Sequence, residues 1–215
     1  MPKRHYVSSV RAAAAAEKRD RVIEAATRLL RENDSIAAFS LDAVAKAAGV
    51  TRLTVYNQFG SRRAVLEAVF DAVAVRGGLH RLAEAMTDSD PHLALARIIT
   101  IFCEFWSFDP GALGLLHAVG SSNPEFAESV NSRNERRRKL LSGLVRRIAQ
   151  DAPAQRAPLQ PKAQRDLVDI LFALTSFAFF SQLTAGGRTA EAACRMVQEL
   201  AEDAVRRAAA ENGRN

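Results

Sequence analysis

The chain has 215 residues, of which 48% are hydrophobic and 25% are charged, and its formal net charge is +6. This length and apolar content allow one sizeable domain or two small ones, each with a proper core. Glycine and proline are sparse, alanine is abundant, and no run alternates cleanly between apolar and polar residues. We therefore predict an all-α fold.

The positive charge is distributed unevenly along the chain. Residues 1–65 hold 12 Lys and Arg against 6 Asp and Glu, whereas residues 66–215 hold 18 of each sign. All of the excess therefore lies in the N-terminal segment, as expected for a small nucleic-acid-binding domain joined to a neutral domain. A solvated basic face is the alternative, and the motif described below makes it less favourable.

Cysteine spacing and hydropathy argue against several other classes. Cys103 and Cys194 form no CxxC pair and no metal-ligand pattern with a histidine, so two buried thiols in a reducing cytoplasm are favoured over a disulfide or redox sensor. No apolar core follows the basic N-terminus, which argues against a signal peptide. The most apolar run, residues 170–183, is too short for a bilayer crossing of ~20 residues. We expect a cytoplasmic protein without a membrane partner.

The N-terminal segment is expected to hold an arm and a first helix. Residues 1–16 are basic, contain no acid and should form a flexible arm, which is either an inert leader or a minor-groove contact. The first helix is predicted over Lys18–Glu32. Its inward stripe consists of Val22, Ile23, Ala26, Leu29 and Leu30.

Two short helices joined by a tight turn come next. Ser40 is a predicted N-cap, and a helix with one buried stripe should run from Leu41 to Ala48. Gly49 ends this helix, and Thr51 is the N-cap of a second helix that buries Val55. Two short helices around a glycine-containing turn form a helix-turn-helix.

The outward face of the second helix can form hydrogen bonds throughout and carries no acid. Its residues are Arg52, Thr54, Tyr56, Asn57 and Gln58. A face meant only for solvation would normally include Glu or Asp, whereas a face that lies on phosphates and base edges excludes them. Gly60 ends this helix, and Ser61 caps the next one, whose first turn holds Arg62 and Arg63. Cations there oppose the helix dipole but suit an end that faces a DNA phosphate.

These residues resemble the DNA-binding domain of the tetracycline-repressor (TetR) family. The matching positions are Phe39-Ser40-Leu41, Val44-Ala45, Ala48-Gly49-Val50, Thr51-Arg52, Thr54, Tyr56 and Phe59-Gly60-Ser61-Arg62. The motif covers about a fifth of the chain and restricts residue types across three helices. The resemblance implies a DNA-binding domain over residues 17–63, a connecting helix over 61–76, and an effector-binding and dimerisation domain over 64–215.

The resemblance also implies DNA contacts, position by position. Those of the recognition helix are Thr51, Arg52, Thr54, Tyr56 and Asn57, and those to phosphate are Ser40 and Arg62. Arg52 is expected to read a base edge, with guanine as first choice, and Tyr56 to reach a phosphate through its hydroxyl. Leu53 stands where a small residue is usual in the family, and Asn57-Gln58 replace a frequent aromatic or histidine pair. Both departures bear on which operator is read.

Caps and breakers predict further helices after the DNA-binding domain. Their ranges are 61–76, 79–86, 92–108, 112–119, 125–150, 162–184 and 190–210, and residues 151–161 form a loop. The run Arg136-Arg137-Arg138-Lys139 is interpreted as a solvated face. A second nucleic-acid patch is less favoured, because Glu125, Glu128 and Glu135 offset part of the charge.

The last two helices are assigned to a homodimer interface. One helix-turn-helix reads too few base pairs for a useful specificity ratio, so such proteins dimerise and read half-sites ~34–36 Å apart or a multiple of that. Helices 162–184 and 190–210 carry more apolar surface than one core should need, and Phe172, Phe177, Phe179 and Phe180 point in several directions. In the TetR family such helices form a four-helix bundle with their mates. Filling the monomer core is the alternative.

The resemblance further implies a small-molecule effector, enclosed by the helices from about residue 79 to residue 150, whose binding spoils the half-site spacing. The candidate lining consists of Leu82, Met86, Phe102, Phe105, Trp106, Leu116, His117, Phe172 and Ser176. It indicates an apolar, partly aromatic ligand with polar anchors at His117 or Ser176. Taken singly, each residue fits ordinary core packing at least as well.

No catalytic residue, metal site or cofactor is predicted. The four histidines stand apart in the sequence, no glycine-rich phosphate loop occurs, and His80 with Glu84 suits a surface ion pair better than a metal. The function predicted is a ligand-responsive transcriptional regulator, a repressor that binds a palindromic operator as a dimer and is released by a largely apolar effector. A structural DNA-binding protein without effector, or an activator of the same fold, are the alternatives.

Overall fold

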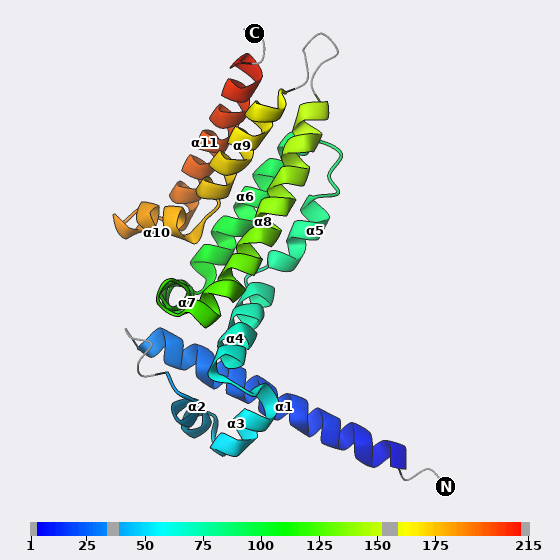
Figure 1. Ribbon diagram of the computed structural model, residues 1–215, viewed down its shortest axis with the longest axis vertical. Helices are drawn as coiled ribbons and strands as arrows, with labels where there is room; N and C mark the ends of the chain where they lie inside the picture. The colour runs from blue at the N-terminus through cyan, green and yellow to red at the C-terminus, as the bar shows by residue number, and fades with distance from the viewer. Residues whose placement is uncertain (1–3, 34–38, 152–158, 212–215) are drawn as a thin grey trace. The chain divides into compact units, whose positions relative to one another are not determined.

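The computed structural model describes residues 4–33, 39–151 and 159–211, and within these ranges all regular structure is helical (Figure 1). The elements are α1 (Arg4–Glu32), α2 (Leu41–Ala48), α3 (Arg52–Phe59), α4 (Arg62–Arg76), the 3-10 helix η2 (Leu79–Arg81), α5 (Leu82–Ala85), α6 (Pro91–Phe108), α7 (Pro110–Ser122), α8 (Pro124–Gln150), α9 (Pro161–Leu174), α10 (Phe177–Ala185) and α11 (Ala190–Glu211). The predicted all-α class is confirmed.

Packing divides the chain into two compact units. The first comprises residues 1–73 and 110–130, and the second comprises residues 74–109 and 131–215. This division differs from the predicted boundary after residue 63, because α7 and the start of α8 pack with the N-terminal helices. Gly111 of α7 comes so close to α1 that a Cβ added to it would lie 3.7 Å from the Cα of Arg31.

In the first unit, α1 begins earlier than the sequence predicted. It starts at Arg4 rather than Lys18, so the expected flexible arm is helical from residue 4, and residues 1–3 lie outside the described ranges. The five consecutive alanines at 12–16 explain the extension, since alanine has the highest helix propensity. The C-terminal half of α1 buries Val22, Ala26 and Leu30, as predicted, and packs on α2 and α7.

Gly120 lies inside α7 and does not end it. The predicted helix stopped at Val119, but α7 continues to Ser122. A Cβ on Gly120 would lie 2.8 Å from Cγ2 of Val130 on α8, so only glycine permits this approach of the two helices. The glycine therefore marks a packing contact, not a helix end.

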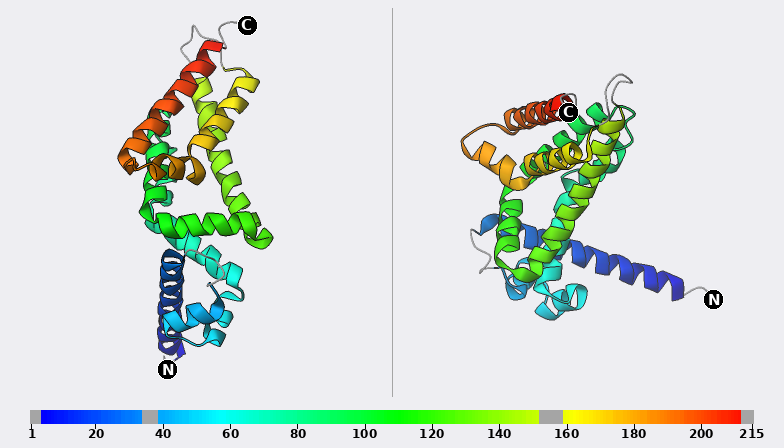
Figure 2. Two further views of the ribbon diagram at one scale, coloured as in Figure 1. Left: turned by 90° about the vertical axis from the view of Figure 1, so that its left-hand side faces the viewer. Right: turned by 45° about the horizontal axis from the view of Figure 1, so that its top comes forward.

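In the second unit, three long helices pack together. Figure 2 shows α11 beside α9 and α6, and these pairs are in direct contact. Asp90 caps α6 by accepting from the amides of His92 and Leu93, and Pro91 occupies the first turn. The helix that follows is buried along most of its length. α6 is therefore the central helix of this unit.

The predicted helix 162–184 is two helices, α9 and α10, bent by 49° at Thr175 and Ser176. The Thr175 hydroxyl donates to the Leu171 carbonyl, and Ser176 caps α10 by accepting from the Phe179 amide at 3.1 Å. Such side-chain bonds compete with the helix ladder. The Thr175 carbonyl accepts instead from Trp106 Nε1 at 3.0 Å and from Arg137 Nη1 at 2.6 Å.

No single helix in the described ranges is long and apolar enough to cross a membrane, although two bent pairs, α6 with α7 and α9 with α10, pass the same test by length and composition.

Candidate nucleic-acid interface

Side-chain caps hold the two short helices of the candidate interface. Ser40 Oγ accepts from the Ala43 amide and Thr51 Oγ1 from the Thr54 amide, each at 3.1 Å. Between the helices, Gly49 has a φ of 64°, a left-handed conformation that favours glycine, and its amide bonds the last carbonyls of α2. These features confirm the predicted helix-turn-helix at the level of individual caps.

The exposed side of α3 presents one apolar and three polar side chains. Val55 is 0% exposed and anchors the helix, whereas Leu53 is 66% and Tyr56 57% exposed. Arg52 and Asn57 are exposed on the same helix, which contains no acidic residue. We call Arg52, Leu53, Tyr56 and Asn57 the recognition face. Leu53, which the sequence singled out only as a departure from the family pattern, is its most exposed large apolar side chain.

Two arginines of α1 hold the ends of the helix-turn-helix. Arg19 Nη1 donates to the Gln58 carbonyl at 3.2 Å, and its guanidinium lies 4.3 Å from the centre of the Phe59 ring. Arg28 Nη2 donates to the Ala47 carbonyl at 3.3 Å, near the end of α2. Arginine suits both positions, since the last carbonyls of a helix lack partners within it. Gln58, expected on the outward face, turns to α1 and donates to the Ala15 carbonyl at 3.4 Å.

The expected DNA contacts outside the recognition face have partners within the protein. The hydroxyls of Thr51 and Thr54 lie 2.9 Å apart, and the Ser40 hydroxyl is engaged as a cap. The Arg62 guanidinium lies 5.9 Å from the centre of the Phe39 ring and is half-buried. Arg63 pairs with Glu67 at 2.9 Å and with Glu128 at 3.6 Å, so its position in the first turn of α4 does not require a phosphate.

One acidic residue lies beside the recognition face. Asp42 Oδ2, in the first turn of α2, is 3.5 Å from Arg52 Nη1, and both side chains are largely exposed. An exposed pair of this kind contributes about 0–1 kcal/mol, so Arg52 can leave it at little cost. The pair holds the guanidinium near the turn of the motif without burying it.

The comparisons with known proteins agree with this geometry. The family model described as "Bacterial regulatory proteins, tetR family" matches residues 22–69, which span the C-terminal part of α1, all of α2 and α3, and the first half of α4. The HTH-type transcriptional regulator EthR of Mycolicibacterium smegmatis is 30% identical over 171 residues, which cover 78% of this chain and 73% of that protein.

The chain belongs to the TetR family of bacterial regulatory proteins. Solved structures of TetR-like regulators share its fold. A regulator from Rhodococcus sp. RHA1 has a TM-score of 0.65 at 19% identity, covering 86% of this chain and 93% of that one. A regulator from Haloarcula marismortui has a TM-score of 0.68 at 14% identity, covering 89% and 98%. This TetR-family member is thus a transcriptional regulator, and its helix-turn-helix is the family's DNA-binding element.

The predicted effector residues divide between the two units of this regulator. Leu116 and His117 lie on α7 in the first unit, where His117 Nδ1 is 2.9 Å from the Leu113 carbonyl of its own helix. The others lie in the second unit: Leu82, Met86, Phe102, Phe105, Trp106, Phe172 and Ser176. Ser176 serves as the cap of α10. Both proposed polar anchors therefore have local hydrogen-bond partners.

Within the second unit, an aromatic cluster surrounds Trp106. Its ring centre lies 4.5 Å from that of Phe105, 6.4 Å from Phe102 and 5.6 Å from Phe177 in an edge-on arrangement. Two pockets of this unit have other linings. One of about 260 Å³ between α6 and α11 includes His92 and Gln198, and one of about 400 Å³ lies between α8 and α9. Neither is lined by any of the predicted effector residues.

Arg137 was missed as a candidate because its four-residue basic run looked like a solvated face. Arg136 and Lys139 are exposed, but the guanidinium carbons of Arg137 and Arg138 lie 4.1 and 4.3 Å from the centre of the Phe172 ring. Burial, with a smaller contribution from Arg138, lowers the pKa of Arg137 to about 10. Its hydrogen-bond partners are the Thr175 carbonyl and the Asn134 side chain, so none in the described chain is a carboxylate.

Proposed function

We propose that this TetR-family regulator is a repressor that binds a palindromic operator as a homodimer and is released by a small, largely apolar effector. The observation that carries the DNA-binding part is the recognition face, a group of exposed side chains on a capped eight-residue helix without an acid. Family membership supports the same conclusion. In this proposal Arg52 reads a base edge, while Tyr56 reaches a phosphate through its hydroxyl.

The DNA-binding part is tested by selecting binding sites from random DNA with the purified chain, then measuring affinity at two salt concentrations. We expect a palindromic site, weaker binding at higher salt, and a loss of about 1–3 kcal/mol for Arg52→Ala. Tyr56→Phe removes only the hydroxyl. Arg188→Ala, an exposed arginine in the turn before α11, is the matched control for lost charge. Binding without sequence preference would favour a structural DNA-binding protein, and no binding would overturn the proposal.

The dimer part rests on exposed apolar residues of α9 and α11. Ile170 is 45% and Leu200 40% exposed, and their helices pack side by side. Three of the four phenylalanines that indicate the interface in the sequence are less suitable: Phe180 is buried, Phe177 meets Trp106 and Phe172 lies under Arg137 and Arg138. The interface is therefore better assigned to Ile170 and Leu200 than to the phenylalanines.

Light scattering after size exclusion tests this interface. Wild type should have the mass of a dimer, and Ile170→Glu and Leu200→Glu should shift it to monomer, because each buries a charge in an apolar contact. Leu93→Glu on α6, at a similarly exposed apolar position, should remain dimeric. A monomeric wild type, or dissociation caused by the Leu93 variant instead, would remove this part of the proposal.

The effector part rests on the aromatic cluster of the second unit and on Arg137. A half-buried cation above an aromatic ring, with no carboxylate among its partners in the described ranges, suits a ligand with an aromatic body and an acidic or acceptor group. Arg137 therefore replaces His117 and Ser176 as the preferred anchor, and Phe102, Phe105, Trp106 and Phe172 remain its apolar neighbours in the proposal.

Trp106 is the only tryptophan of the chain, so its fluorescence reports on this cluster. We would screen aromatic carboxylic acids against the matching amides, following fluorescence and release of operator DNA. A binding acid should lose affinity in Arg137→Met by more than its amide does, because only the acid gains a charge-assisted bond. Equal losses for acid and amide would contradict the role of Arg137, and an absence of any binder among both classes would count against an aromatic effector.

A further inference from the structure

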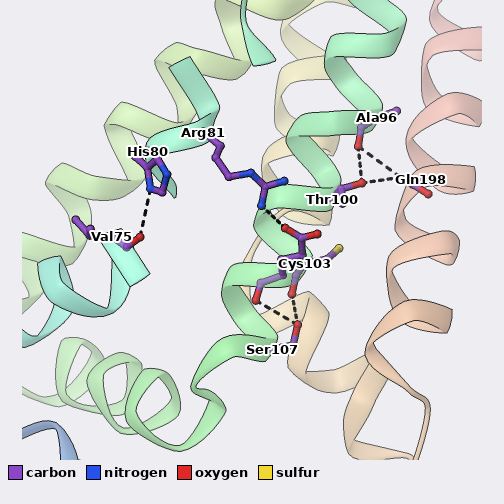
Figure 3. Close-up of polar contacts among 9 residues, drawn as sticks. Val75, His80, Arg81, Ala96, Thr100, Cys103, Ser107 and Gln198 are labelled. Atoms are coloured by element: carbon purple, nitrogen blue, oxygen red, sulfur yellow. Dashed lines mark hydrogen bonds and ion pairs between the residues drawn. The ribbon is translucent and has the colours of Figure 1, made fainter. Parts of the chain in front are cut away.

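Helices α6 and α11 are held in register by one glutamine. Gln198 Nε2 on α11 donates to Thr100 Oγ1 at 3.0 Å and to the Ala96 carbonyl at 3.4 Å on α6 (Figure 3). One helical turn away on each helix lie Cys194, four residues before Gln198, and Cys103, three residues after Thr100. Residues three or four apart share a helix face, so this register places the two cysteines opposite each other.

The two thiols meet across the helix pair. Cys103 and Cys194 interact closely enough to shift each other's pKa in opposite directions, and Figure 3 shows the Cys103 sulfur on the side of α6 where Gln198 lies. The cysteines are 91 positions apart in the sequence, so their spacing gave no sign of this contact. Both cysteines are free thiols, as expected, but Cys194 is only partly buried and the two lie opposite each other.

The two cysteines differ in access and in chemistry. Cys103 is 5% exposed, whereas Cys194 is only half-buried. The hydrogen bond from Cys103 lowers the pKa of Cys194, and the Thr100 hydroxyl and Arg195 add to this, against the opposing effects of burial and Glu104. The bond to Cys194 and burial raise the pKa of Cys103. Cys194 is therefore the thiol that loses its proton first, and the thiolate is the nucleophilic form.

We propose that Cys103 and Cys194 are an oxidation site at which a hydroperoxide closes a reversible disulfide between α6 and α11. In the first step, the Cys194 thiolate attacks one peroxide oxygen. An S–O bond forms, the O–O bond breaks, and hydroxide (or alkoxide) leaves with the electron pair. In the second step, the Cys103 sulfur attacks the Cys194 sulfenic acid. An S–S bond forms, the S–O bond breaks, and the departing hydroxide takes the Cys103 proton as water. Two electrons pass from the thiols to the peroxide.

The contact explains why the pair should close within one chain. The register that Gln198 sets places each cysteine opposite its partner, so the Cys103 sulfur is positioned to attack the sulfenic acid on Cys194 ahead of a second peroxide. The resulting bond would fix α11, a proposed dimerisation helix, to α6, which carries Trp106. Closure of this disulfide requires neither the operator nor the effector.

The test uses the full chain with hydrogen peroxide. Wild type should lose both free thiols, lose two hydrogen atoms in mass, yield one tryptic peptide pair joined through Cys103 and Cys194, and recover with dithiothreitol. On a non-reducing gel it should migrate as a monomer. In the Cys194→Ser variant, the remaining Cys103 thiol should stay reduced under these conditions. In the Cys103→Ala variant, oxidation should stop at a sulfenic acid on Cys194, which dimedone labels.

A second measurement separates reactive from merely adjacent thiols. The rate of Cys194 alkylation by iodoacetamide should rise with pH to a plateau, with a midpoint below that of an ordinary thiol. Arg195→Met should move this midpoint upward, because it removes a positive charge that favours the thiolate. The proposal is overturned if native protein keeps both thiols at peroxide levels that oxidise the urea-unfolded chain, if Cys194 accumulates only sulfinic acid, or if the disulfide joins two chains.

Discussion

The guanidinium carbon of Arg19 lies 4.3 Å from the centre of the Phe59 ring, so that α1 covers the last residue of α3. The same arginine donates to the Gln58 carbonyl, one of the last carbonyls of that helix. α3 has eight residues and one fully buried side chain, Val55. Its orientation therefore depends on contacts that other helices provide, and Arg19 is among them.

Changing Arg19 should affect DNA binding without any contact to DNA. Arg19→Lys keeps the positive charge but loses the planar guanidinium, which stacks on Phe59 and donates to the Gln58 carbonyl at the same time. Arg19→Ala loses the charge as well as the guanidinium. We expect about 0.5–1 kcal/mol lower stability and a few-fold weaker operator binding for either variant, because the recognition helix is less well held. Thermal unfolding and gel-shift titration measure the two effects. Arg21 is exposed on the same helix, so Arg21→Ala should change neither the thermal stability nor the operator affinity. Equal effects at the two positions would contradict the role of Arg19 in holding α3.

Asp42 should restrain DNA binding. Asp42→Asn removes the carboxylate 3.5 Å from Arg52, and with it a negative charge beside the recognition face, so the affinity for operator DNA should rise a few-fold. The same change removes an acid from the first turn of α2, which should cost about 0.3–1 kcal/mol of stability. Titration at two salt concentrations checks the first effect, with Glu24→Gln on α1 as the charge control. An unchanged or lower affinity would show that the ion pair orients Arg52 productively.

Leu53 should recognise a thymine methyl group. It is 66% exposed on a helix whose other exposed side chains are polar, and a leucine in the major groove can contact the C5 methyl of thymine. Replacing single thymines of the selected operator by uracil removes that methyl alone. At one position this replacement should cost the wild type about 1 kcal/mol of binding free energy. The Leu53→Ala variant should bind the thymine and uracil operators equally well at that position. Wild-type indifference to every uracil would remove Leu53 from direct readout while leaving the operator itself established.

Gly120→Ala should destabilise the first unit, although this change normally favours a helix. The added Cβ would lie 2.8 Å from Cγ2 of Val130, and a β-branched neighbour has little freedom to move aside. We expect a loss of about 1–3 kcal/mol in chemical unfolding. In a Val130→Ala background the same substitution should become nearly neutral, which gives a double-mutant cycle for the contact. Additive losses would mean that the strain lies elsewhere.

Much of the candidate interface could be predicted because its determinants are local. Ser40 and Thr51 cap helices that begin one residue later, and the caps satisfy amides only three positions away. The buried stripe of α4 follows from helical spacing alone. Its members are Val65, Leu66, Val69, Phe70 and Val73. For such features, residue type and spacing contain the whole physical cause.

What the sequence by itself determined about this protein was the helix-turn-helix, its polar recognition helix and the TetR family. Only the tertiary structure decided the break at Thr175, the burial of Arg137 and the pairing of Cys103 with Cys194. The Thr175 carbonyl can leave its helix because Trp106 and Arg137, 69 and 38 positions away, donate to it. A hydrogen bond or thiol contact over such separations depends on how helices pack, and no local pattern of residues records that packing.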